Sequence, residues 1–306
     1  MDKIAIVGAG FYGLMLGKML SKKYKVDIFE EQNDIMTQAS AQCQMRIHSG
    51  MMYPRNLKTA MMCVRTFKPF MLKFKDAIVD DFKSLYAVAN DSKISSKEFF
   101  ETQKKLGLSI KKIKNEFFDN VQDVYECNEF TFDVDIIKKT LSDQNIILNT
   151  KIENINQLKN YDKIFICAYD KTNELLINSR MDPIENLNVF NTEKLFVKDN
   201  LGDTAVCVVD GDYFATMCLP DKFNGIKTLA AAELTSNVNT SQKDKVFERV
   251  QHFIPDVKLT YLYSTFGKKA VIGNQRSYYM NVNKNIYTII GGKITNVFEL
   301  FDKLRF

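Results

Sequence analysis

The sequence contains few of the residues that build metal sites and disulfide frameworks. Of its 306 residues only two, His48 and His252, are histidines. The six cysteines are scattered, with no C-x-x-C pair and no spacing typical of metal ligands. We therefore expect no metal site. We also expect the cysteines to be reduced, buried thiols, as in a cytoplasmic protein.

Long apolar runs and export signals are also missing. No uninterrupted apolar stretch of about 18 residues occurs, so no membrane span is predicted. The N-terminus lacks both a positive n-region and a small-residue cleavage site, because Asp2-Lys3 is followed by patterned glycines. These absences predict a soluble chain located in the cytoplasm.

Charge of one sign is not concentrated anywhere that would suggest a nucleic-acid interface. The 42 basic and 37 acidic residues are interleaved and leave a formal net charge of +5. No basic stripe with interleaved aromatic residues is visible, so nucleic-acid binding is not expected. The hydrophobic content of 45% is enough to bury a large core, and the length suits two domains.

The most informative segment is the N-terminal one, which reads as strand, glycine turn, helix and second strand. The turn Gly8-Ala9-Gly10-Phe11-Tyr12-Gly13 matches G-x-G-x-x-G. In that motif Gly8 permits a tight turn, Gly10 lets backbone N–H groups approach a pyrophosphate, and Gly13 lets the helix lie close to the strand. Glu30 ends the second strand, where an acid accepts hydrogen bonds from an adenosine ribose. This segment predicts a dinucleotide-binding βαβ unit.

The remaining pattern indicates that the nucleotide-binding sheet is assembled from distant segments. The first βαβ unit cannot complete a doubly wound sheet, and the apolar runs at 163–168 and 286–290 suit buried parallel strands. Between them, Asp210-Gly211-Asp212 is a hairpin signal. We predict an α/β fold with a discontinuous Rossmann-like FAD-binding domain and a second, mostly antiparallel β-sheet substrate or cap domain. The predicted FAD-binding domain comprises residues 1–78, 142–185 and 267–306, and the substrate domain comprises residues 79–141 and 186–266.

A polar and aromatic loop follows the second strand and a short linker. Arg46, His48, Tyr53 and Arg55 crowd around Gly50 in the segment QCQMRIHSGMMYPRNLKTA. In an open α/β sheet this connection reaches the carboxyl edge, where ligands bind. The loop is therefore a site candidate. The alternative is a surface loop whose arginines pair with scattered acids.

A second candidate lies near the C-terminus, at Gly291-Gly292-Lys293-Ile294-Thr295-Asn296. Two glycines end a predicted strand and a helix begins at once, so N–H groups and a positive dipole face whatever lies there. Such a terminus would stabilise the negative charge of a reduced flavin. Thr295 or Asn296 can equally serve as the N-cap of the last helix, and the two roles are compatible.

These segments together resemble the D-amino-acid-oxidase-like family of FAD-dependent oxidoreductases. The resemblance runs through GAGFYG with Glu30, RIHSGMMYPR, KIFICAYDKTN and GGKITNVF, and so covers nearly the whole chain. It is closest to a bacterial branch with an R-x-H-x-G-x-x-Y-P loop and a G-G-K-x-T-N closing turn. That branch often occurs in surface-polysaccharide gene neighbourhoods. The resemblance implies non-covalent FAD and oxidation of a small amino or hydroxy compound by hydride transfer to the flavin.

The resemblance also implies a set of cofactor contacts. The residues expected to bind FAD lie in the glycine turn, at the end of the second strand, in the polar loop and in the closing turn. They are Gly8, Gly10, Phe11, Tyr12, Gly13, Glu30, Ala41, Arg46, His48, Gly50, Gly291, Gly292, Lys293, Ile294 and Thr295. Covalent attachment of the flavin through His48 is not expected, because the usual flanking pattern is absent.

For the chemistry, the candidate catalytic residues are Arg46, His48 and Tyr53. His48 or Tyr53 would take the substrate's hydroxyl or amine proton, and His48 is better matched near neutral pH. Arg46, Arg55 or Arg276 would hold an anionic substrate group as a planar fork. His48 can instead be a hydrogen-bonded structural residue.

Two other classes of function remain open. One is a flavin-dependent mutase or isomerase acting on a nucleotide sugar without net redox change. Its expected glycine-rich second turn is missing, since residues 30–42 contain no glycine. The other is a non-catalytic flavoprotein or NAD-binding module. The closing turn GGKITN favours FAD over NAD.

Overall fold

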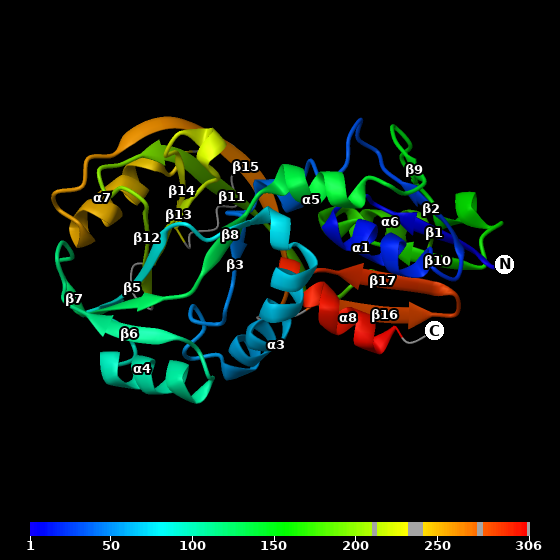
Figure 1. The fold of residues 1–306 in the computed structure, drawn as a ribbon. Helices are drawn as coiled ribbons and strands as arrows, with labels where there is room; N and C mark the ends of the chain where they lie inside the picture. The colour runs from blue at the N-terminus through cyan, green and yellow to red at the C-terminus, as the bar shows by residue number, and fades with distance from the viewer. Residues whose placement is uncertain (210–212, 232–240, 274–277, 305–306) are drawn as a thin grey trace. The chain divides into compact units, whose positions relative to one another are not determined.

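The computed structural model describes residues 1–209, 213–231, 241–273 and 278–304, and Figure 1 shows its ribbon. The chain divides into two compact units, each assembled from separate segments. Unit 1 comprises Met1–Gln42, Val134–Phe190 and Lys268–Phe306, and unit 2 comprises Cys43–Asp133 and Asn191–Gly267.

Unit 1 is built on a six-stranded sheet with the strand order β16-β17-β10-β1-β2-β9. Neighbouring strands from β17 to β9 are parallel, and β16 pairs with β17 in the antiparallel direction. The strands are β1 (Lys3–Val7), β2 (Lys25–Phe29), β9 (Ile146–Ile147), β10 (Lys163–Ile166), β16 (Tyr279–Asn283) and β17 (Ile286–Ile290). The predicted discontinuous sheet is confirmed, because β10 lies between β1 and β17.

Helices and short 3₁₀ turns connect the strands of unit 1. The apolar residues of β1 and β10 are almost entirely buried, as expected for central parallel strands. The predicted closing helix at 294–304 is instead a 3₁₀ turn followed by a short α-helix. The elements are α1 (Phe11–Leu20), α2 (Ala39–Gln42), α5 (Val134–Leu141), η2 (Ile155–Leu158), η3 (Tyr169–Lys171), α6 (Thr172–Asn178), η5 (Ile294–Asn296) and α8 (Val297–Lys303).

The larger sheet has the strand order β15-β11-β14-β13-β12-β5-β7-β6, and most of it belongs to unit 2. The pairs β11–β14, β14–β13, β13–β12, β5–β7 and β7–β6 are antiparallel, and β12 runs parallel to β5, which confirms the predicted mostly antiparallel second sheet. Its strands are β5 (Lys83–Ala89), β6 (Ile110–Ile113), β7 (Val121–Cys127), β11 (Leu187–Lys198), β12 (Thr204–Val209), β13 (Phe214–Cys218), β14 (Lys227–Ala231) and β15 (Thr260–Ile272).

A three-stranded sheet, a 3₁₀ turn at each of two chain reversals, and three α-helices complete unit 2. The small sheet has the order β3-β8-β4. Helix α4 begins with a reciprocal capping box formed by Ser95 and Glu98. The elements are β3 (Arg46–Ile47), α3 (Leu57–Lys73), η1 (Lys75–Ala77), β4 (Ile78–Val79), α4 (Ser96–Lys105), β8 (Phe130–Phe132), η4 (Asp221–Phe223) and α7 (Lys243–Phe253).

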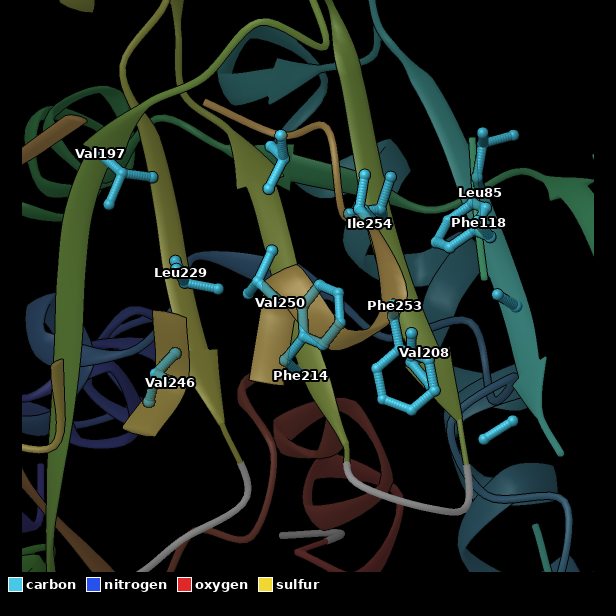
Figure 2. Close-up of a cluster of buried hydrophobic side chains, with 14 of the residues drawn as sticks. Leu85, Phe118, Val197, Val208, Phe214, Leu229, Val246, Val250, Phe253 and Ile254 are labelled. Atoms are coloured by element: carbon cyan, nitrogen blue, oxygen red, sulfur yellow. The ribbon is translucent and has the colours of Figure 1, made fainter. Parts of the chain in front are cut away.

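The main core of unit 2 lies between α7 and the large sheet, as Figure 2 shows. Val246, Val250 and Phe253 recur at helical spacing and are buried on one face of α7. The Phe253 ring contacts that of Phe214 on β13, with centroids 6.1 Å apart. Alternate residues of the strands supply the opposing surface, among them Leu229 on β14.

The boundaries of the compact units differ from the predicted domain boundaries by more than five residues in two places. Residues 43–78 lie in unit 2, because Arg46 and Ile47 on β3 pair with Thr131 and Phe130 on β8. Helix α5 lies in unit 1, where Lys138 forms an ion pair with Asp34. Neither pairing has a local signal in the sequence.

Some of the predicted features lie outside the described residues. Arg276 and the turn Asp210-Gly211-Asp212 belong to them, although the strands β12 and β13 that flank the turn pair as predicted. Within the described ranges, no helix is long and apolar enough to cross a membrane. The same ranges contain no group of three or more His, Cys, Asp or Glu residues placed to hold a metal ion.

Candidate functional site

Two glycines of the N-terminal turn are required by the packing of the protein itself. Gly8 has a φ of +101°, and a Cβ atom there would lie 2.6 Å from the carbonyl oxygen of Cys167. A Cβ atom on Gly13 would lie 1.9 Å from the carbonyl oxygen of Gly8. The predicted roles of a tight turn and a close helix–strand approach therefore match the geometry.

Gly10 differs from these two glycines. It is the N-cap of α1 with a φ of −70°, which any residue adopts. The nearest atom to an added Cβ would be Ser40 Oγ at 3.5 Å, an ordinary contact. Packing within the described residues therefore does not explain why this position lacks a side chain. An approaching ligand does explain it, since a pyrophosphate needs that space.

The first turn of α1 is positioned to receive an anion. The helix begins without a side-chain cap and has no acidic residue in its first turn. The N–H group of Phe11 donates to Ser40 Oγ at 3.0 Å, and Ser40 lies beside Ala41 on α2. The positive end of the helix is thus not neutralised by a carboxylate of its own first turn.

Glu30 has a local structural role in addition to the predicted ribose contact. The side chain is buried; its Oε2 accepts from the N–H of Ala9 at 2.7 Å, and its Oε1 accepts from the N–H of Gln32 at 3.0 Å. The carboxylate therefore holds the glycine turn in place. Each carboxylate oxygen has a second lone pair, so these bonds leave acceptor capacity for a ligand hydroxyl.

The closing turn contacts the glycine turn through Tyr12. The hydroxyl of Tyr12 donates to the carbonyl oxygen of Lys293 at 2.7 Å. A Cβ atom on Gly291 would lie 2.5 Å from the Tyr12 ring, so only glycine allows this approach. Removal from water raises the pKa of Tyr12 well above its ordinary value, which keeps the hydroxyl a donor. Two candidate segments nearly 280 positions apart are thereby brought together.

The alternative N-cap reading of the closing turn is not favoured. Thr295 and Asn296 are buried, but α8 begins after Asn296 without a side-chain cap hydrogen bond. Lys293 precedes the 3₁₀ turn η5 in an extended conformation, also without a side-chain cap. Because α8 has only seven residues, the N–H groups of the turn matter more here than a long helix dipole.

In unit 2, Arg46 is buried against a partner that sequence reasoning missed. Its guanidinium forms an ion pair with Glu129, and both side chains are almost fully buried. Burial is the largest single influence and lowers the pKa of Arg46. The charge of Glu129 outweighs it only together with its hydrogen bond and with Cys207 and Tyr213, and the pKa is raised above the ordinary value. The guanidinium atom Nη1 faces Cys207 Sγ at 3.8 Å. Arg46 is therefore engaged by the protein itself.

Glu129 is the centre of a buried hydrogen-bond network. Its Oε1 accepts from both the N–H and the Oγ of Ser49, at 2.9 and 2.8 Å. Its Oε2 accepts from the hydroxyl of Tyr86 on β5. Because Ser49 follows His48, this carboxylate fixes the backbone of the candidate loop at the catalytic candidate.

The other residues of the loop differ in exposure. His48 and Tyr53 are half-buried, with ring centroids 5.8 Å apart, whereas Arg55 is exposed. Gly50 has a φ of +121°, and a Cβ atom there would lie 2.9 Å from the carbonyl oxygen of Ala60 on α3. The loop therefore packs closely against α3 at Gly50. His48 and Tyr53 are the two polar aromatic residues near this contact in the sequence.

The comparisons with known proteins were made for the whole chain. No protein-family model matches it. The FAD-dependent monooxygenase kojA of Aspergillus flavus is 30% identical over 104 residues, which cover 32% of this chain and 24% of that protein. The chain therefore matches about a quarter of the length of this curated relative.

The solved structures show the fold over nearly the full length. Glycine oxidase from Geobacillus kaustophilus aligns with a TM-score of 0.76 at 12% identity, covering 97% of this chain and 92% of the other. Dithionite-reduced L-α-glycerophosphate oxidase from Mycoplasma pneumoniae, with FAD bound, aligns with a TM-score of 0.78 at 16% identity, covering 99% and 94%. The chain therefore has the fold of these two oxidases, as the resemblance in the sequence predicted.

Proposed function

We propose that the chain is an FAD-dependent oxidoreductase that oxidises a C–N or C–O bond of a small amino or hydroxy compound. The observation that carries the proposal is the joint geometry of the two turns of unit 1. The glycine turn leaves space at Gly10 and an uncapped helix start, and the closing turn is held against it by Tyr12. The full-length fold similarity to flavoprotein oxidases supports the same conclusion.

The residues of unit 1 fit the cofactor. The N–H groups at the start of α1 would hold the pyrophosphate, and Glu30 would accept from the ribose with its remaining lone pairs. Gly291, Gly292 and Lys293 would hold the flavin ring with the N–H groups of the turn. We therefore assign unit 1 as the FAD-binding domain and unit 2 as the substrate domain.

When bound, FAD supplies the two-electron acceptor, and the chain supplies binding, orientation and proton transfer. We assign the proton transfer to His48 or Tyr53. Both are half-buried, so water reaches them and a small substrate can do the same. Arg55 is exposed and is our candidate for holding an anionic substrate group. We assign Arg46 to positioning, because Glu129 occupies its guanidinium.

The motifs also suggest a setting for the reaction. The loop R-x-H-x-G-x-x-Y-P and the turn G-G-K-x-T-N resemble the bacterial branch met near surface-polysaccharide genes, so we propose a precursor of such a polymer as the substrate. The six cysteines, all within the described residues, form no disulfide, in agreement with a proposed cytoplasmic location.

The first experiment is an absorbance spectrum of the purified protein. We expect yellow protein with the bands of oxidised flavin. Gly10→Val should lose them, while its thermal melting matches that of the parental protein stripped of flavin, because a bound cofactor itself stabilises the folded state. The reason is that Gly10 has room for a side chain in the protein but not beside a pyrophosphate. Colourless parental protein that takes up NAD and not added FAD would refute the proposal.

A second experiment separates oxidation from isomerisation without net redox change. Anaerobic mixing of the flavin-loaded protein with panels of amino and hydroxy compounds should bleach the flavin for the correct class. A nucleotide sugar that is rearranged while the flavin stays oxidised at the end of each turnover would instead identify a mutase.

A further inference from the structure

Helix α3 carries a stripe of exposed residues that the proposed function does not use. At 100° per residue, Leu57, Met61, Arg65, Lys68 and Leu72 lie within about 80° of one another on the helix circumference. All five are exposed, and the stripe lies opposite the face that is buried in unit 2. The helix is the blue-to-cyan one labelled α3 in Figure 1.

Three large apolar side chains in this stripe are unusually open to water. The exposed fractions are 53% for Leu57, 50% for Met61 and 68% for Leu72. Single exposed apolar residues are common, but here three stand in one line along a single helix. The line extends about 22 Å from Leu57 to Leu72, at a rise of about 1.5 Å per residue.

The charge around the stripe has one sign only. Between Arg55 and Lys75 the sequence contains six basic residues and no acidic one. Each of the six is exposed. They are Arg55, Lys58, Arg65, Lys68, Lys73 and Lys75. Residues 257–298 also contain six basic residues and no acidic one, but spread over 42 positions instead of 21, so the basic charge is denser around α3.

We propose that the exposed stripe of α3 docks the chain on a membrane surface rich in anionic lipid headgroups. Lysine and arginine would meet the phosphates, and the three apolar side chains would enter the boundary between headgroups and acyl chains. A nucleic acid would engage the cations but leave the apolar side chains in water. The chain binds this surface from one side, without a membrane span.

The proposal is tested by sedimenting the full-length, flavin-loaded chain with lipid vesicles at physiological salt. Vesicles of phosphatidylglycerol mixed with phosphatidylcholine should carry the protein down, and vesicles of phosphatidylcholine alone should not. Raising the salt should weaken the binding, since the electrostatic part is screened. Absence of sedimentation with the anionic vesicles would overturn the proposal.

Charge variants locate the surface. The triple variant Lys58→Glu, Lys68→Glu and Lys73→Glu should weaken vesicle binding about a hundredfold or more, given roughly a fivefold loss for each cation removed. The matched control places the same three charge changes on α4. It is the triple variant Lys97→Glu, Lys104→Glu and Lys105→Glu, all exposed. Equal losses in both triples would mean that only the net charge matters, which overturns the proposal.

An apolar variant distinguishes lipid from other anions. Leu57→Ser, Met61→Ser and Leu72→Ser together should weaken vesicle binding about tenfold or more, because less apolar surface enters the bilayer. All three side chains are exposed, so the melting temperature and the flavin spectrum should stay parental. Unchanged vesicle binding, or preferential binding of a single-stranded oligonucleotide that this variant retains, would overturn the assignment to a membrane.

Discussion

The glycine turn of unit 1 and the Arg46–Arg55 loop of unit 2 hold their shapes by different means. In the turn, backbone atoms leave no room for side chains at Gly8 and Gly13. In the loop, a buried carboxylate, Glu129, gathers Arg46, Ser49 and Tyr86. The constraint in the turn comes from neighbouring backbone atoms, and only a residue without a Cβ atom satisfies it. A side-chain network depends on charge and on a partner 83 positions away.

The two regions should therefore fail in different ways when they are mutated. The predictions below are ordered by the expected loss in the free energy of unfolding, from the largest to the smallest. Losses at Gly13 report on the backbone constraint of the turn, and losses at Arg46 report on the side-chain network of the loop.

The largest effect is expected at the buried ion pair. Arg46→Ala should lower the free energy of unfolding by about 3–5 kcal/mol, because Glu129 is left buried and uncompensated. Urea denaturation followed by circular dichroism measures this loss. The double variant Arg46→Met with Glu129→Gln should recover part of it, because it removes both charges while an amide oxygen still accepts from Ser49. A loss below about 1 kcal/mol for Arg46→Ala would show that the pair is well solvated.

The next effect is expected at Gly13. Gly13→Ala should lower the free energy of unfolding by about 1–3 kcal/mol despite the better helix propensity of alanine, since its Cβ would overlap the Gly8 carbonyl. Gly10→Ala is the matched control in the same turn and should change stability by no more than about 0.5 kcal/mol. Equal effects at both positions would show that the turn relaxes freely and is not fixed by packing.

A smaller effect is expected at Tyr12. Tyr12→Phe should cost about 0.5–1.5 kcal/mol, because it removes the hydrogen bond to Lys293. Since the pKa of Tyr12 is raised on folding, the hydroxyl's contribution is complete below about pH 10 and is lost as the pH rises further. Urea melts from pH 7 to 10.5 measure this. A difference in the free energy of unfolding between the parental protein and Tyr12→Phe that grows with pH would contradict the assigned role.

The smallest effect on stability is expected at His48, together with a large effect on rate. His48→Ala should change the free energy of unfolding by less than about 1 kcal/mol, since the side chain is only half-buried. If it moves the substrate proton, flavin reduction should slow about a hundredfold or more in stopped-flow measurements. Tyr53→Phe is the companion variant. A parental rate for His48→Ala and a slowed one for Tyr53→Phe would transfer the role to Tyr53.

The same contrast explains how much of the molecule could be read from its sequence. The strands β10 and β17 were predicted as sheet partners of β1, because continuous apolar runs mark buried parallel strands. The glycine turn is predicted from its spacing together with the flanking strands, the helix and Glu30. Both signals are local, so neighbouring residues suffice to recognise them.

The missed features depend on distant contacts. Glu129 stands in the segment CNEFTF, where nothing marks it as the partner of Arg46. Ser40 lies in a polar stretch without periodicity, yet its hydroxyl accepts from the N–H of Phe11. The strand β11 was not recognised, because LNVFNTEKLFVK mixes polar and apolar residues without strict alternation.

The order of strands in the sheet of unit 1 has a consequence for folding of the chain during its synthesis on the ribosome. Strand β1 is made first but lies in the interior of the sheet, and its neighbour β10 emerges only after about 160 further residues. The opposite side of β10 stays unpaired until β17 is made, about 120 residues later. The nascent chain therefore exposes unpaired strand edges for most of its synthesis. Chaperones that cover these edges would prevent aggregation of this architecture.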